Sequence, residues 1–285
     1  MQARAALRTG LCALTLLLAG CQTVHTTNAG AVGVTRSQSM ANFVSEADLR
    51  ATAVQNYQQT LAGGQKAGKL NDDPALTRRV RAISSRLIAQ TAYFRADAPK
   101  WPWEVNVMDS PELNAWCMPG GKVMVYSGLV KQLQLTDDEL AAVIGHELAH
   151  ALREHARERI SREYGQNLLL TVGMVALGVS GPAAQLGDML GKVTFSLPHG
   201  RTQETEADGM GLELMARAGY DPAAAVNVWR KMARVQQSQQ AEFLSTHPSS
   251  STRIAELQAL LPKVTPLYEA AQRKGSNSPR RGALQ

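Results

Sequence analysis

Apolar residues recur along most of this chain at the spacing of an α-helix. They stand three or four positions apart, which places them on one face of a helix and leaves the opposite face polar. The pattern predicts helices at about residues 45–62, 73–93, 136–152, 202–218, 222–240 and from about 250 onward. We therefore expect a mainly helical protein.

Residues typical of helix ends flank several of these stretches. Thr136 is followed three positions later by Glu139, a capping box in which each side chain can accept a hydrogen bond from the other residue's backbone amide. Asp73-Pro74 indicates a helix start and Gly219 a helix end. Gly63-Gly64 is expected to interrupt the first helix, because glycine is a poor helix former.

Between residues 101 and 129 the period changes to two, which indicates β-strands. Valines alternate with polar neighbours on both sides of a Pro-Gly-Gly turn, at positions 105, 107, 123 and 125. We expect a small antiparallel sheet there. With the helices, this predicts an α+β fold in one domain at residues 45–265, because 285 residues are enough for one generous core and no long repeat is present.

The first 21 residues have the features of a bacterial lipoprotein leader. Two arginines precede a short apolar run at residues 11–18, and Leu18-Ala19-Gly20-Cys21 follows directly. The run is too short to span a bilayer, which needs about 20 apolar residues. The last four residues resemble the lipobox, so we expect a signal peptide at residues 1–20 and a lipid on Cys21. Gln22 after the cysteine favours the outer membrane.

Two segments lack the pattern of a folded core. The stretch after Cys21 is rich in Thr, Gly, Ser, Ala and Asn, and we expect residues 21–44 to be a flexible tether. Residues 266–285 are expected to be a basic, disordered tail. Much of the net charge of +6 lies in the leader and this tail. The tail lacks the aromatic residues of nucleic-acid platforms, so no nucleic-acid partner is expected.

An apolar run at residues 168–179 is too short to cross a membrane. It is interpreted as part of a mobile cover over a cleft or as a segment resting on the membrane surface. An internal core helix is the alternative. Beside Cys21, the expected mature chain keeps only Cys117, which lies in a strand-like stretch and is expected to pack as a small hydrophobic residue.

The helix expected after Thr136 carries the chemistry. His146-Glu147-Leu148-Ala149-His150 places two imidazoles four residues apart. Such side chains share one helix face, with Cβ atoms about 5 to 6 Å apart, so both can bind one zinc ion. Glu147 lies one residue further round, where its carboxylate can act on a water molecule without being a ligand. Burying this set without a metal would be costly.

A catalytic zinc ion needs a third protein ligand and keeps one position open. One class of metallopeptidase places a third histidine six residues after the second, but that position is Ala156 here. His155 is one residue short; we expect it to be an exposed polar residue, with support of a ligand as the alternative. A glutamate on a later helix can also complete the site, and the stretch from Gln203 to Asp208 contains two, Glu204 and Glu206.

These motifs resemble the gluzincin metallopeptidases of the HtpX, BepA and LoiP type, which include the CAAX prenyl protease. The resemblance covers about residues 45–262 and implies a zincin-type domain with one zinc ion per chain. It implies Glu204 as the third ligand and Asp208 as the residue that orients a ligand imidazole. The spacing agrees, because the two lie four residues apart on one helix face. Glu206 would then point elsewhere. The lipobox favours the LoiP-like lipoprotein branch.

The resemblance implies roles for two more segments. Asn114, Ala115 and Trp116 correspond to an edge strand that flanks the active site and binds extended substrate through its backbone. Thr246-His247-Pro248 corresponds to a loop, and its proline predicts a turn. His247 would then either stabilise the oxyanion as a hydrogen-bond donor or occupy the open zinc position and switch the enzyme off. The resemblance to BepA favours the second role, and a surface histidine in a Ser-rich loop that makes no metal contact is the alternative.

Together these observations predict a zinc-dependent endopeptidase of the bacterial cell envelope, anchored by lipid and facing the periplasm. It would degrade misfolded or misassembled envelope proteins, with Glu147 moving the proton in peptide hydrolysis. The alternative is a chaperone-like protein with a structural zinc ion that binds unfolded clients without cleaving them. A peptidoglycan hydrolase could use the same metal chemistry, but no motif indicates sugar binding.

Overall fold

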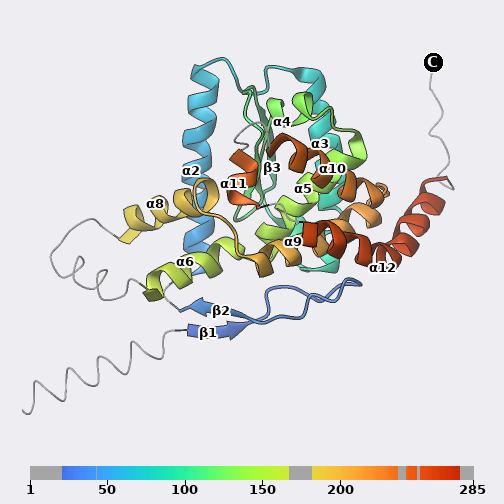
Figure 1. Cartoon of the computed structure of the whole chain (residues 1–285). Helices are drawn as coiled ribbons and strands as arrows, with labels where there is room; N and C mark the ends of the chain where they lie inside the picture. Colours follow the sequence, from blue (N-terminus) through green and yellow to red (C-terminus); the bar gives the residue numbers. More distant parts are fainter. Residues whose placement is uncertain (1–20, 43, 167–181, 237–241, 249–250, 277–285) are drawn as a thin grey trace, which may run out of the picture.

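The computed structural model describes residues 21–42, 44–166, 182–236, 242–248 and 251–276. Helices surround a small central sheet, which confirms the mainly helical α+β prediction (Figure 1). The helices are α2 (Glu46–Lys66), α3 (Pro74–Ile88), α4 (Ser127–Gln132), α5 (Asp137–Leu152), α6 (His155–Gln166), α8 (Pro182–Phe195), α9 (Arg201–Arg217), α10 (Ala223–Gln236), α11 (Glu242–Thr246) and α12 (Ser251–Ser276).

The central sheet contains β3 (Glu104–Met108), β4 (Ala115–Met118) and β5 (Lys122–Tyr126) in the order β3-β5-β4. β4 and β5 are antiparallel as predicted, but β3 and β5 are parallel, so the small sheet is mixed rather than antiparallel throughout. The chain passes from β3 to the far edge before the glycine turn brings β5 back into the middle. Gly120 and Gly121 have φ angles of 79° and 83°, which glycine adopts readily.

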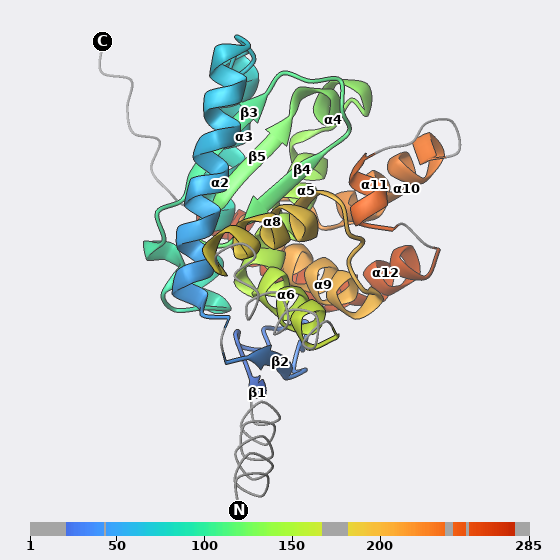
Figure 2. The same cartoon turned by 90° about the vertical axis from the view of Figure 1, so that its left-hand side faces the viewer.

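The two faces of this sheet pack against different helices. One face contributes Val107, Val123 and Val125 to the core that also contains side chains of α3 and α5. The other contributes Trp116 and Met124 to a second core with α2 and α8 (Figure 2). β4 therefore lies at the sheet edge, packed between α5 and this outer helix layer.

The predicted helix ends are partly confirmed. The Thr136 capping box is formed, with Glu139 N donating to Thr136 Oγ1 at 3.2 Å. α2 does not stop at Gly63 but continues to Lys66, because tertiary packing favours glycine there. A Cβ on Gly64 would lie 2.6 Å from the Met108 side chain, so this glycine permits close approach rather than interrupting the helix.

α5 and α9 cross at very short range. A Cβ added to Gly211 would lie 2.7 Å from His146 N, and one added to Gly145 would lie 3.0 Å from the Gly211 carbonyl oxygen. Both distances are shorter than ordinary van der Waals contact. The absence of these two side chains therefore brings the metal-motif helix and the glutamate-bearing helix together.

The expected tether is a packed element. Residues 21–41, here called the N-terminal strap, contain β1 (Cys21–Val24) and β2 (Gln38–Ala41), which pair antiparallel with Cys21 opposite Ala41. Val32 N donates to Glu213 at 3.0 Å, and Gln38 Nε2 donates to the Arg153 carbonyl oxygen at 2.7 Å. The prediction failed because the strap is held by polar contacts to the core, which hydrophobic periodicity does not register.

The boundary expected at residue 265 falls inside a helix. α12 continues to Ser276 and packs against α9 and α10, with Leu257 and Val264 buried. The expected tail therefore begins with helix, and residues 277–285 lie outside the described region. The apolar run at residues 168–179 also lies outside it. Within the described ranges, no helix has both the length and the apolar character needed to cross a membrane.

Candidate metal centre

Three side chains of the predicted motif lie in the α5–α9 interface. His146, Glu147 and His150 are 2%, 3% and 5% exposed, so the motif is fully inside the protein. α9 contributes Glu204, whose exposure is 2%. The sequence prediction that these two helices share one site is therefore confirmed in space.

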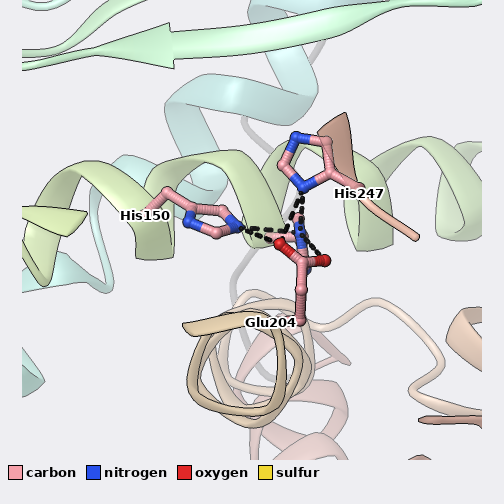
Figure 3. Close-up of side chains that lie close together, drawn as sticks. His150, Glu204 and His247 are labelled. Carbon is pink, nitrogen blue, oxygen red and sulfur yellow. Dashed lines mark hydrogen bonds and ion pairs between the residues drawn. The ribbon is translucent and has the colours of Figure 1, made fainter. Parts of the chain in front are cut away.

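A fourth group completes the cluster. His247 follows α11 and lies against Glu204 and His150 (Figure 3). One potential ligand atom from each of His146, His150, Glu204 and His247 lies within 4.8 Å of all the others. The Nε2 atoms of His146 and His150 are 3.0 Å apart, and Glu204 Oε1 is 3.3 Å from His150 Nε2.

These atoms fit one zinc ion. Bonds of about 2.0 to 2.1 Å in a tetrahedron place neighbouring ligand atoms about 3.3 Å apart, close to the separations found here. His146 Nδ1 lies 3.0 Å from Asp208 Oδ1, and this carboxylate contact holds the proton on Nδ1 and leaves a lone pair on Nε2. Facing lone pairs repel each other unless a cation lies between them. The donor set of imidazole and carboxylate is also one that zinc prefers.

Comparison with known proteins agrees with this geometry. Residues 74–261 match the sequence profile of Peptidase family M48. The chain belongs to peptidase family M48. The predictions of a peptide hydrolase and of one zinc ion are confirmed at the level of this family.

Named relatives of this M48 chain come from mitochondria and from bacteria. Mitochondrial metalloendopeptidase OMA1 of Schizosaccharomyces pombe is 39% identical over 163 residues, which are 56% of this chain and 47% of the relative. Metalloprotease LoiP of Escherichia coli is 31% identical over 154 residues, 53% of this chain and 60% of the relative. The chain thus spans about half the length of the OMA1 protein. Sequence identity by itself does not favour the LoiP branch.

Charged side chains hold two of the proposed metal ligands, His146 and Glu204, in position. Arg253 Nε and Nη2 donate to the two oxygens of Asp208 at 2.7 and 2.8 Å, and Arg253 Nη1 forms an ion pair with Glu204 Oε2 at 2.6 Å. Burial would raise the pKa of Asp208, but this guanidinium holds it below its usual value. Asp208 is therefore a fixed, ionised acceptor for His146.

His155 is not the exposed residue that the sequence favoured. It is 0% exposed, its Nδ1 lies 2.8 Å from His150 Nδ1, and its Nε2 lies 3.0 Å from Glu206 Oε2. Glu206 points away from the cluster, as expected. The helical turn after α5 folds back onto the core and buries His155. The position of His155 in the sequence did not predict this burial.

Glu147 has the setting of a general base. Its Oε1 is buried and makes no hydrogen bond to any described group, and His247 Nε2 lies 3.5 Å from it. Burial raises the pKa of Glu147. The buried carboxylate of Glu204 differs, because His247 and His146 overcome the effect of burial and hold its pKa well below the usual value.

A cavity connects this cluster with the edge strand. Trp116 and Cys117 of β4 line it together with Glu147, His150 and residues at the end of α8. Asn114 and Ala115 directly precede Trp116 in the sequence, and both are buried. The Asn114 carbonyl oxygen accepts a hydrogen bond from Tyr126 N at 3.0 Å. The predicted position of the strand beside the site is confirmed, whereas substrate contact remains a prediction.

His199 is a residue of the site that no sequence motif predicted. Its ring lies 4.1 Å from the His150 ring and 4.7 Å from the His247 ring, measured between centroids, and it lines the same cavity. Arg159 Nη1 contacts His199 Nε2 at 3.2 Å. His199 stands just before the glutamate-bearing helix, but no metal motif includes that position, so its location could come only from the folded chain.

The close helix crossing is tested by adding single methyl groups. Gly211→Ala should destabilise the protein by about 1–3 kcal/mol through overpacking and weaken zinc binding, because the new Cβ would push α9 away from His146. Gly209→Ala is the matched control, since its Cβ would meet only ordinary contacts, the nearest at 3.5 Å. Denaturant unfolding and zinc titration measure both effects. Equal behaviour of the two variants would refute the argument.

Proposed function

We propose that this M48 chain is a zinc-dependent endopeptidase of the bacterial cell envelope that degrades misfolded or misassembled proteins. One observation carries the catalytic part of the proposal. Glu147 places a carboxylate oxygen that accepts no hydrogen bond from a described group beside the converging nitrogens of His146 and His150 and the carboxylate of Glu204. This arrangement combines a cation site with a base that is not itself one of its ligands.

The residues divide the chemistry between them. A bound zinc ion supplies Lewis acidity toward water and toward the scissile carbonyl group. Glu147 accepts the proton of the attacking water and returns it to the leaving amine. His146, His150 and Glu204 hold the ion, and Asp208 fixes the ring of His146.

The proposed substrate is an extended segment of an unfolded protein. β4 pairs with β5 on one side only among the described strands, and its residues Trp116 and Cys117 line the cavity of the metal centre. Pairing through backbone groups would select for an extended chain more than for a particular sequence. That weak selectivity suits a protease of damaged envelope proteins. A relative from Yersinia pestis, 27% identical over 197 residues that are 65% of this chain and 38% of the relative, is named a beta-barrel assembly-enhancing protease, and a role in the assembly of other proteins is in keeping with this proposal.

We further propose that the chain is a lipoprotein of the outer membrane, similar in organisation to the LoiP-like branch. The support is the Leu18-Ala19-Gly20-Cys21 sequence with Gln22 after it. Cys21 is exposed, as lipidation requires.

His247 is proposed to be an inhibitory ligand. With His146, His150 and Glu204 it makes a set of four protein donors, and four protein ligands are typical of closed zinc sites. Its Nδ1 lies 3.1 Å from both Glu204 Oε1 and His146 Nε2, inside the cluster rather than beside it. This position favours the plug over the oxyanion donor. A closed set of four would also suit the chaperone-like alternative, so activity must decide between them.

Replacing the base should separate metal binding from turnover. Glu147→Gln should keep one zinc ion per chain and lower cleavage of unfolded casein by roughly 10²-fold or more, because the amide cannot accept the proton. Zinc content and casein cleavage are measured for wild type, Glu147→Gln and Glu269→Gln, whose exposed carboxylate lies on α12. Full activity of Glu147→Gln would refute the assignment of the base.

Removing the plug should open the site. His247→Ala should raise basal casein cleavage and self-cleavage with zinc retained, whereas loss of an oxyanion donor would lower turnover by roughly 10²-fold or more. His25→Ala is the control, because His25 is exposed on the N-terminal strap. If wild type and His247→Ala both bind zinc yet neither cleaves casein or an unfolded outer-membrane protein, the chaperone-like alternative replaces the enzyme.

The lipid anchor is tested in bacterial cells fed labelled palmitate. Wild type should incorporate label and sediment with the outer-membrane fraction. Cys21→Ala should do neither, because the acceptor thiol is gone. Cys117→Ala is the matched control and should behave as wild type, since Cys117 lies in β4. Label in the Cys21→Ala protein at the wild-type level would exclude lipidation at this residue.

A further inference from the structure

The contacts of His150 extend away from the metal cluster in an unbroken line. One ring nitrogen, Nε2, faces Glu204 and His146, and the other is directed away from them (Figure 3). That second nitrogen, Nδ1, lies 2.8 Å from His155 Nδ1, and His155 Nε2 lies 3.0 Å from Glu206 Oε2. All three side chains are buried.

Hydrogen-bond chemistry fixes the direction of this line. An ionised carboxylate only accepts, so the proton of neutral His155 lies on Nε2 and is donated to Glu206. His155 Nδ1 is then an acceptor, and only a proton on His150 Nδ1 can complete the contact. The remaining nitrogen of His150, Nε2, must carry a lone pair directed into the cluster. The line therefore selects the tautomer of His150 that can bind a metal ion.

Glu206 is held in place by two arginines. Arg36 Nε and Arg153 Nη2 donate to Oε1 at 2.8 and 3.0 Å, and Arg36 Nη2 donates to Oε2 at 2.9 Å. With His155 on Oε2 as well, both oxygens have fixed partners. The carboxylate therefore stays ionised and oriented, because turning it would break several charge-assisted hydrogen bonds at once.

Arg36 comes from an unexpected part of the chain. It belongs to the N-terminal strap, which precedes the residues 74–261 that match family M48. The same guanidinium binds Glu158 of α6, with Nη1 2.5 Å from Oε1. The strap thus joins α6 and α9 directly behind the turn that carries His155.

We propose that Arg36, Glu206 and His155 form a positioning relay, which holds His150 in the tautomer whose Nε2 binds zinc. The N-terminal strap is thereby part of the metal centre. The inference rests on the proposed zinc site but concerns different residues: none of the three relay groups touches the metal or the substrate. Asp208 performs the corresponding task for His146 through one carboxylate, whereas His150 depends on a histidine, a carboxylate and the strap.

The relay can be observed in the wild-type chain without any substitution. In metal-free protein at pH 8, imidazole ¹⁵N chemical shifts should show His150 protonated at Nδ1 and His155 protonated at Nε2. A proton on His150 Nε2 in this sample would overturn the relay. The measurement needs neither zinc nor proteolysis, so its outcome is independent of the proposed function.

Variants test the consequence for the metal. His155→Leu fills the space without hydrogen bonds and should weaken zinc binding by about 10- to 100-fold in a chelator competition. His155→Gln keeps one acceptor and one donor and should restore most of that loss. Arg36→Gln should also weaken zinc binding. Arg217→Gln is its control, since Arg217 pairs with Glu213, which binds the strap at Val32 and does not touch the relay.

The outcomes separate the two proposals. If wild type binds one zinc ion and His155→Leu, His155→Gln and Arg36→Gln bind it equally well, the relay is wrong and the zinc site stands. If wild type binds no zinc, the proposed function fails, and the ¹⁵N shifts of the metal-free protein alone decide whether the relay fixes the tautomer of His150. Melting temperatures of the metal-free variants identify a purely structural role, in which zinc affinity would follow stability and Arg217→Gln would weaken binding as much as Arg36→Gln.

Discussion

The short distance between α5 and α9 is the constraint on which the rest of the structure depends. Gly145 and Gly211 allow the two backbones to approach within a range that any pair of larger residues would prevent. At that separation His146 and His150 of one helix reach Glu204 of the other. The surrounding core is close-packed, so a small change in this distance would move every ligand atom. Precision at the metal centre comes from this packing rather than from the histidine motif.

Each ionisable group buried at this site needs a partner of opposite charge. Asp208 and Glu204 are matched by Arg253, and Glu206 is matched by Arg36 and Arg153. Each guanidinium offers several donors in a fixed plane, which suits two carboxylate oxygens better than a lysine would. Glu147 is matched least closely, because its Oε1 accepts no hydrogen bond from a described group and its contact with His247 Nε2 is 3.5 Å long. In a site where the other charges are neutralised, this is where a reacting proton can go.

Structural support reaches the metal centre from both ends of the described chain. The N-terminal strap contributes Arg36 behind His150, and α12 contributes Arg253 behind His146. α12 also packs along α9, and the loop before it carries His247 into the cluster. The segments that hold the two ligand histidines are therefore distant in sequence from the motif. Apart from α5 and α9, the residues that complete and support the metal centre come from the C-terminal part of the described chain and from the N-terminal strap.

The sequence by itself determined the local features. The capping box at Thr136, the helical spacing of His146 and His150, and the alternating valines of the sheet are set by neighbours within a few residues, and all appear in the structure. With the family resemblance, it also identified Glu204 and Asp208. Tertiary structure decided the parallel pairing of β3 with β5, the continuation of α2 through Gly64, and the burial of His155. It also decided that residues 21–41 form a strap, because polar contacts between distant residues leave no periodic pattern in the chain.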